Sequence, residues 1–109
     1  MDLAAQVETN LVHYTLWTNV QVFRNNGLAI LRGLPPSKLA DLDPENLQEW
    51  VVPKAMHEAK CSMGEISLWF DRVAEIDLRP KRITLAIVND DGTVVYYFVH
   101  DGVTKPRQN

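Results

Sequence analysis

The stretch from Ile83 to Val99 reads ITLAIVNDDGTVVYYFV, and it decides the fold. Two runs rich in β-branched and aromatic residues flank an Asp-Gly pair, which is among the strongest hairpin signals that a sequence carries. The second run, Val94 to Val99, is apolar at every position, whereas a strand with one face in water alternates apolar and polar side chains. Both faces of this strand therefore need cover. Little chain follows it, so a partner chain is the natural cover.

The size and composition indicate one ordinary globular domain. The chain has 109 residues, and we take residues 1–109 as a single domain with a core of usual size. Hydrophobic residues make up 46% and charged residues 23%, which is typical of a folded protein. The longest apolar runs are far shorter than the ~20 residues that cross a bilayer, so we expect no membrane insertion.

The charge argues against tight binding of nucleic acid by the isolated chain. The formal net charge is −3, whereas such proteins are usually basic because their affinity comes largely from neutralising phosphates. Three basic residues do gather before the hairpin, namely Arg79, Lys81 and Arg82. They form either a local RNA-binding patch or a set of solvated charges at the ends of elements.

Periodicity predicts the elements of the first half. Residues 3–16 carry apolar side chains at the helical period, behind Asp2 as a capping residue. A turn signal at residues 25–27 separates two short apolar runs, 20–23 and 28–31. We therefore expect a helix followed by a second hairpin.

Prolines and a capping signal divide the second half. Residues 35–47 read as a surface loop, and residues 48–52 as a strand closed by Pro53. Ser62–Glu65 matches a capping box and opens a helix that Pro80 ends. Its predicted apolar face comprises Ile66, Trp69, Phe70, Val73 and Ile76. The order of elements predicts an α/β fold with a mixed, largely antiparallel sheet flanked by helices.

Catalytic and metal-binding signals are weak. His57 and Cys61 stand four residues apart, a spacing that places both on one face of a helix. A zinc site would need further ligands, and Cys61 is the sole cysteine of the sequence. A Cys–His nucleophilic pair would need an orienting third group, which the flanking residues do not offer. The sequence has no phosphate-binding glycine motif either, so we expect no metal and no cofactor.

Two other features allow two interpretations each. The rings of Trp17, Trp50 and Trp69 could form a stacking platform for bases, but their places in predicted elements favour the core. Asp90 and Asp91 at the hairpin tip are explained by turn chemistry. They would equally serve as an acidic knob for a basic pocket on another protein.

Three segments together resemble a known family. Residues 84–97 (TLAIVNDDGTVVYY), with Asp101-Gly102 soon after, are similar to the C-terminal end of the smallest subunit of the eukaryotic tRNA-splicing endonuclease. Residues 10–20 (NLVHYTLWTNV) and 31–39 (LRGLPPSKL) are similar to the fungal form of that subunit. The resemblance spans most of the chain.

The resemblance implies a small nuclease-like domain with a structural, non-catalytic role in a heterotetramer that removes introns from precursor tRNA. In this family the last strand pairs edge to edge with a catalytic subunit, and the acidic loop before it docks into a basic groove of another subunit. The loop residues here are Asp90 and Asp91. Alone, the chain should hide its free strand edge in a two-fold homodimer. The residues that match the pairing strand are Thr93, Val94, Val95, Tyr96, Tyr97, Phe98 and Val99.

Catalytic members of the family cut RNA with a Tyr, His and Lys triad. Lys81 and Arg82 fall near the place of the lysine and His57 near that of the histidine, but no tyrosine matches. The resemblance thus implies a subunit without its own active site, in the nucleus or on the cytosolic face of mitochondria. Arg79, Lys81 and Arg82 are its candidate contacts with precursor tRNA. The alternatives are a metal-independent ribonuclease in which His57, a basic residue and a tyrosine converge, and a stand-alone RNA-binding module.

Overall fold

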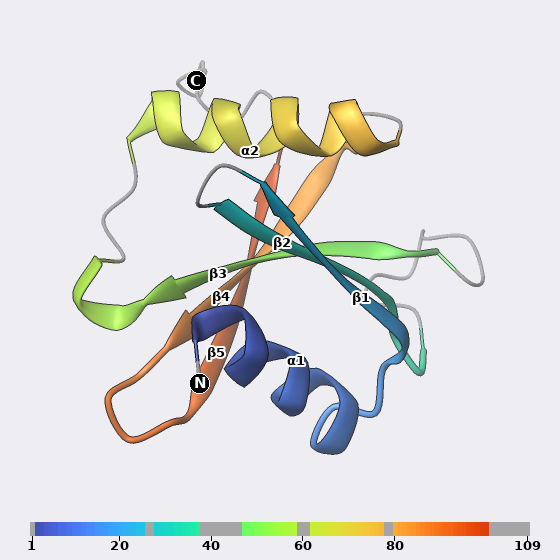
Figure 1. The fold of residues 1–109 in the computed structure, drawn as a ribbon, viewed down its shortest axis with the longest axis vertical. Coiled ribbons are helices and arrows are strands. Elements are labelled where there is room, and N and C mark those ends of the chain that lie inside the picture. The colour runs from blue at the N-terminus through green and yellow to red at the C-terminus, as the bar shows by residue number, and fades with distance from the viewer. Residues whose placement is uncertain (1, 26–27, 38–46, 59–61, 78–79, 101–109) are drawn as a thin grey trace, which may run out of the picture.

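The computed structural model describes residues 2–25, 28–37, 47–58, 62–77 and 80–100 (Figure 1). The helical elements are α1 (Leu3–His13), the short 3₁₀ helix η1 (Met56–Glu58) and α2 (Met63–Ile76). The strands are β1 (Thr18–Asn25), β2 (Leu28–Leu34), β3 (Glu49–Ala55), β4 (Arg82–Val88) and β5 (Val94–His100). Neither α1 nor α2 is long and apolar enough to span a membrane.

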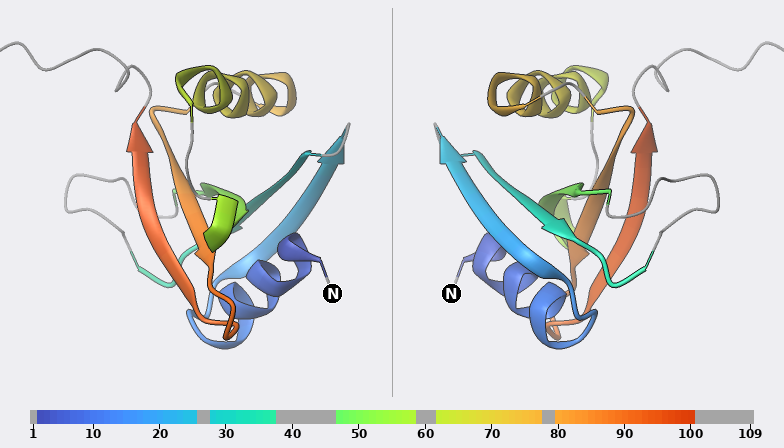
Figure 2. Two further views of the ribbon diagram at one scale, coloured as in Figure 1. Left: turned by 90° about the vertical axis from the view of Figure 1, so that its left-hand side faces the viewer. Right: turned by 90° about the vertical axis from the view of Figure 1, so that its right-hand side faces the viewer.

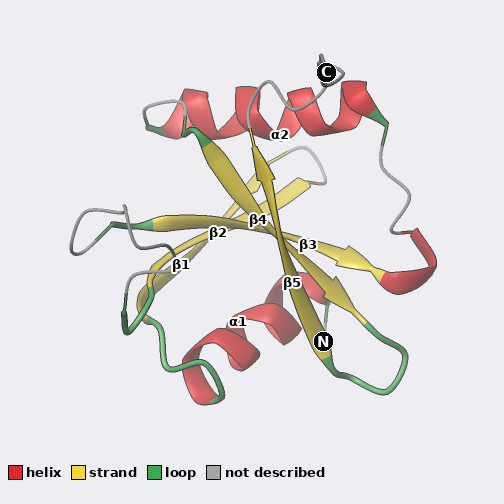
Figure 3. Cartoon of the chain, turned by 180° about the vertical axis from the view of Figure 1, so that it is seen from behind, coloured by secondary structure: helices red, strands yellow, loops and turns green. Residues whose placement is uncertain are grey.

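The strands form one five-stranded sheet in the order β1-β2-β3-β4-β5. All neighbours are antiparallel except β3 and β4, which are parallel and are joined through η1 and α2. The sheet is strongly twisted, so that β5 and β3 cross at a steep angle when the molecule is seen from behind (Figure 3). The α/β class and the mixed, largely antiparallel sheet are confirmed.

The helices cover opposite faces of the sheet (Figure 2). Successive strand residues point to opposite faces, and two apolar clusters follow from this alternation. Leu31, Val51 and Ala86 pack with α1, whereas their neighbours Ile30 and Val52 pack with α2. Because both faces are covered, β4 is buried at every position from its second residue on.

The helix ends follow the capping signals. Asp2 accepts a hydrogen bond from the backbone of Ala5 at 2.9 Å and begins α1. The helix ends at His13, before the predicted residue 16, because Leu16 adopts the left-handed conformation with φ of 60°. At α2 the Ser62 hydroxyl accepts from the backbone of Glu65 at 3.0 Å. The predicted helix starts are both confirmed.

The carboxylate of Glu65 pairs with Lys54 at 2.5 Å and thereby ties α2 to β3. Within α2, the residues predicted to face the core are buried at Trp69, Phe70 and Val73, but Ile76 is 41% exposed in the last turn. The apolar face of this helix therefore ends one turn earlier than the sequence pattern indicates.

The prediction that Pro53 closes the third strand is wrong. Strand β3 continues to Ala55, and Pro53 pairs in register with Ala86 of β4. The pairing of β3 with β2 ends at Val51, so a proline at position 53 leaves the ladder with β2 intact although it has no N–H group. Most of the predicted 35–47 loop lies outside the described residues.

Candidate functional site

The outer edge of β5 is the most distinctive surface of the described chain. Strand β5 is antiparallel to β4 and is the last strand of the sheet order, so its second edge has no strand neighbour among the described residues (Figure 2). Exposed apolar side chains accompany this edge: Val95 is 40%, Tyr97 57% and Phe98 43% exposed. An edge strand of this kind presents unpaired backbone groups that can pair with another strand.

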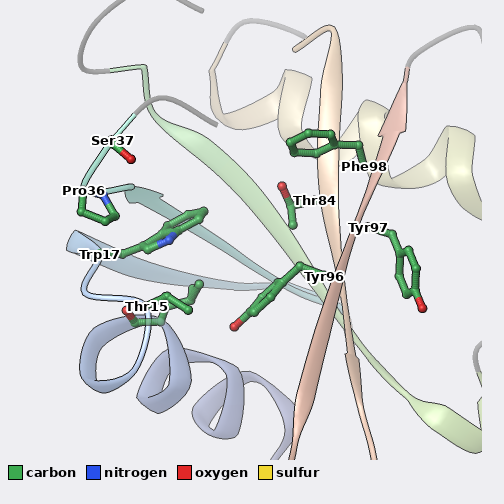
Figure 4. A pocket seen from close by; sticks show the side chains of 9 residues that line it. Thr15, Trp17, Pro36, Ser37, Thr84, Tyr96, Tyr97 and Phe98 are labelled. Carbon is green, nitrogen blue, oxygen red and sulfur yellow. Dashed lines mark hydrogen bonds between the residues drawn. The ribbon is translucent and has the colours of Figure 1, made fainter. Parts of the chain in front are cut away.

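Helices of the same chain cover part of β5. Val94 and Tyr96 pack against the cluster under α1, and Val99 packs against the cluster under α2. Tyr96 and Tyr97 lie on opposite sides of the strand (Figure 4). The expectation that both faces lack cover is therefore correct only for the exposed residues Val95, Tyr97 and Phe98, because α1 and α2 come from earlier parts of the chain.

The hydroxyl of Tyr96 fixes β5 to α1. It lies 2.6 Å from Oδ1 of Asn10, a residue 86 positions away in the sequence. Burial of this side chain raises the pKa of Tyr96 to about 12, because the charged phenolate would be poorly solvated there. Tyr96 is thus a structural member of the strand that the resemblance assigns to assembly.

Arg82 fixes the opposite half of β5. Its guanidinium makes two contacts to the Glu49 carboxylate, at 2.6 and 3.4 Å, and lies 4.3 Å from the centre of the Phe98 ring. The group therefore joins β3, β4 and β5. Of the three candidate RNA contacts, Arg82 is engaged in this ion pair and Lys81 is exposed. The third, Arg79, lies outside the described residues.

The two acids at the tip of the β4–β5 turn differ in their surroundings. Oδ1 of Asp91 accepts hydrogen bonds from both the hydroxyl and the backbone N–H of Thr93, at 2.7 and 3.1 Å. These bonds hold the pKa of Asp91 below its ordinary value. Asp90 is exposed and makes no hydrogen bond or ion pair with the described residues. Thr93 belongs to this turn, and β5 begins at Val94.

A groove of about 330 Å³ lies beside β5 on the face that carries α1 (Figure 4). Leu11, in the last turn of α1, and Thr15, just after that helix, form one wall, and Phe98 of β5 forms another. Thr84 of β4 also lines it, and it is 3% exposed. The Thr84 hydroxyl has no hydrogen bond partner among the described residues. The groove thus combines an apolar lining with one unpaired polar group.

The residues of the ribonuclease alternative are not brought together. His57 follows the end of β3, and Lys81 precedes the start of β4. Because β3 and β4 are parallel, with Ala55 opposite Val88, these positions lie at opposite ends of the sheet. The length of β4 separates them by about 20 Å at ~3.3 Å per residue.

The tryptophans and the candidate metal ligands do not form a binding site in the described part of the chain. Trp17, Trp50 and Trp69 are all buried, as the core interpretation predicts. Trp50 also lies 5.2 Å from the guanidinium of Arg32, which explains an arginine within this sheet. Among the described residues no group of three His, Cys, Asp or Glu side chains could hold a metal ion, and Cys61 lies outside them.

Two participants were missed by sequence reasoning. Glu49 reads as one more acid in a polar stretch, yet it is 3% exposed and pairs with Arg82, 33 positions away. Thr84 reads as an ordinary β-branched strand residue. In both cases the surroundings of the side chain come from distant parts of the chain, for which the local pattern carries no signal.

Comparison with known proteins finds a matching family model and two similar fungal proteins. A family model described as "Sen15 protein" matches residues 6–109. The chain is 38% identical over 107 residues to a tRNA-splicing endonuclease subunit SEN15 from Eremothecium gossypii, covering 98% of this chain and 91% of that protein. It is also 36% identical over 81 residues to a probable tRNA-splicing endonuclease subunit, tsp-1, from Neurospora crassa. That match covers 56% of this chain and 36% of the longer relative.

Proposed function

This chain belongs to the Sen15 protein family, and on that premise we propose that it is a non-catalytic structural subunit of the tRNA-splicing endonuclease heterotetramer. In this role it pairs through β5 with a catalytic subunit and positions that subunit for cleavage of precursor tRNA. It has a second contact to the complex through its acidic turn.

The observation that carries the proposal is the open edge of β5. The strand is seven residues long, lies at the end of the sheet and exposes Val95, Tyr97 and Phe98. Addition of a partner strand would satisfy its backbone groups, and alternate side chains would contribute specificity. The inner edge is held by β4 along its whole length, so the strand is already ordered before a partner arrives.

Asp90 is the proposed docking group of the acidic turn. Oδ1 of Asp91 accepts a hydrogen bond from Thr93 within the turn, whereas Asp90 is exposed at the tip. An exposed carboxylate on a well-ordered turn suits a basic pocket, because charge complementarity favours the correct partner over wrong ones.

The position of His57 supports the non-catalytic part of the proposal. A phosphodiester transfer needs a base, an acid and a cation near one phosphate. His57 and Lys81 lie at opposite ends of β4, and Arg82 is committed to Glu49. On this proposal precursor tRNA is bound by the assembled complex, and Lys81 is its contact in the described part of this chain.

Co-expression with a catalytic subunit tests the proposal. We expect the unaltered chain to co-purify with that subunit, and the double variant Val95→Asp/Tyr97→Asp to lose it, because charge at the open edge disfavours strand addition. Leu68→Asp is the control, since Leu68 is likewise an exposed apolar residue, 43% exposed, but belongs to α2 and not to β5. Retention of the partner by the β5 variant would contradict the proposed interface.

The same variants test whether the isolated chain forms a dimer, and a His57 variant tests the ribonuclease alternative. We expect sedimentation to show a concentration-dependent dimer of the isolated chain, which Val95→Asp/Tyr97→Asp converts to a monomer. A complex that contains His57→Ala should cut precursor tRNA as fast as the unaltered complex. If the isolated chain made a specific cut that His57→Ala abolished, the ribonuclease alternative would replace the structural one.

A further inference from the structure

The groove beside β5 is open where α1 ends. Leu11 and Thr15, at and just after the end of that helix, border it on one side, and Trp17 and Ser37 border it on another. In Figure 4 the side chains of Thr15, Trp17 and Ser37 and the rings of Tyr96 and Phe98 surround a common space. The groove therefore occupies a part of the sheet face that α1 leaves uncovered.

The floor of the groove holds a group that lacks a partner. Thr84 is only 3% exposed, and its hydroxyl has no hydrogen bond partner among the described residues. A buried hydroxyl without a partner costs free energy, and native structures seldom leave one so. This hydroxyl can therefore donate a hydrogen bond to, or accept one from, a group that enters the groove.

We propose that the groove receives one side chain of the subunit that pairs with β5, an apolar body with a neutral polar tip such as that of tyrosine. The inference rests on the function proposed above. Phe98 and Tyr97 line the groove and also belong to the open strand, so the groove is continuous with the proposed pairing edge. A residue that flanks the added strand can reach over β5 into this space.

The lining favours a neutral occupant over a phosphate. The groove residues are aliphatic, aromatic or hydroxylic, and no charged side chain lines it. Hydroxyl groups can contact phosphates, but the affinity for a nucleic acid backbone comes largely from lysine and arginine, which are absent from this lining. A neutral, largely apolar side chain with one hydrogen-bonding atom fits the lining and the Thr84 hydroxyl together.

Filling the groove tests the inference in the co-expressed complex. Ser37 is exposed at the groove, and Ser37→Trp would occupy the space with little effect on the core. We expect it to weaken association with the catalytic subunit by about tenfold or more. Ser67→Trp is the matched control, because Ser67 is an exposed serine on α2, and it should bind as the unaltered chain does.

A second variant probes the hydroxyl. Thr84→Val keeps the shape of the side chain and removes the unpaired group, so the isolated chain should be at least as stable to urea. Association should still weaken, by about threefold to tenfold, because the polar tip loses its partner. If the Thr84→Val chain bound the catalytic subunit as well as the unaltered chain does, the proposed hydrogen bond between the occupant and Thr84 would be refuted.

A photo-crosslinker names the occupant. Benzoylphenylalanine at position 37 of the complex should attach to a peptide of the catalytic subunit next to its pairing strand. Attachment to precursor tRNA or to a second copy of this chain would overturn the inference. If Ser37→Trp leaves association unchanged while the β5 double variant abolishes it, the inference fails and the proposed function survives. If neither variant matters, the proposed function fails as well.

Discussion

Nη2 of Arg82 lies 2.6 Å from Oε2 of Glu49, and both side chains are largely buried, at 13% and 3% exposure. The same guanidinium lies 4.3 Å from the centre of the Phe98 ring. The pair therefore joins the first residues of β3 and β4 and supports the strand proposed for assembly. A residue that the sequence suggests for RNA binding has a structural role here.

Loss of this guanidinium should destabilise the fold. Arg82→Met leaves the Glu49 carboxylate buried without this partner, and breaking a buried ion pair in this way costs about 3–5 kcal/mol. We expect that decrease in the free energy of unfolding, measured with urea.

The neighbouring lysine supplies the control for that measurement. Lys81→Met removes an exposed charge and should change the stability by no more than about 0.5 kcal/mol. The double variant Glu49→Met/Arg82→Met removes both charges and should be more stable than Arg82→Met alone. Equal effects of Arg82→Met and Lys81→Met would show that the ion pair contributes nothing.

The partly buried Tyr96 side chain predicts a stability that depends on alkaline pH. The pKa of Tyr96 is raised to about 12 in the fold, whereas an unfolded tyrosine ionises near its ordinary value of 10.0. A raised pKa means that the folded state keeps its proton longer, so this contribution is complete below pH 10 and is lost as the pH rises toward 12.

Comparison with Tyr96→Phe isolates that contribution. The variant loses the hydrogen bond to Asn10, which should cost about 1 kcal/mol at neutral pH. Urea unfolding from neutral to alkaline pH should show a smaller decline for the variant than for the unaltered chain. Parallel declines would mean that Tyr96 does not titrate in this range.

Gly33 is required by its close neighbours. A Cβ atom at this position would lie 2.9 Å from Cε3 of Trp17 and 3.0 Å from Cγ2 of Val20. Gly33→Ala should therefore lower the free energy of unfolding by about 1–3 kcal/mol, because the buried indole must move. Gly64→Ala is the opposite case, since a Cβ atom there meets only Ser62 Oγ at 3.9 Å. We expect it to be neutral or stabilising in calorimetry, since alanine favours a helix.

The hydrogen bonds of Asp91 in the acidic turn predict a stability that depends on acidic pH. Hydrogen bonds from Thr93 lower the pKa of Asp91, so the folded state favours the ionised form. This contribution is present above the ordinary pKa of 3.8 and is lost as the pH falls through the lowered value. Asp91→Asn should therefore weaken the acid dependence of unfolding, measured by chemical unfolding at several acidic pH values. An acid dependence equal to that of the unaltered chain would contradict the assignment.

The sequence predicts the elements well where local chemistry determines them. The Asp-Gly turn, the caps at Asp2 and Ser62 and the periodicity of the helices place each element close to its observed position. The terminal strand was expected to need a partner, and it does lie at the end of the sheet. These features depend on residues a few positions apart.

Features that depend on distant residues were not predictable. Pro53 reads as the end of a strand, but a proline is tolerated where one neighbouring strand has stopped, and that depends on how far β2 extends. Likewise, Arg82 reads as a free charge until Glu49 is placed beside it. The cover that α1 and α2 give to β5 belongs to the same class, because it follows from topology.

The parallel pair in the middle of the sheet has a consequence for the folding pathway. The hairpins β1–β2 and β4–β5 close over short turns and can form early, whereas β3 meets β4 only after η1 and α2 have bridged them. Contacts between segments so distant in sequence form slowly, since much chain entropy is lost before they are made. We therefore expect the seam from Val51 to Ala55 to form late, so that a newly made chain displays its β4–β5 hairpin before its sheet is complete. A partner present while the chain folds would meet that hairpin before the seam has closed.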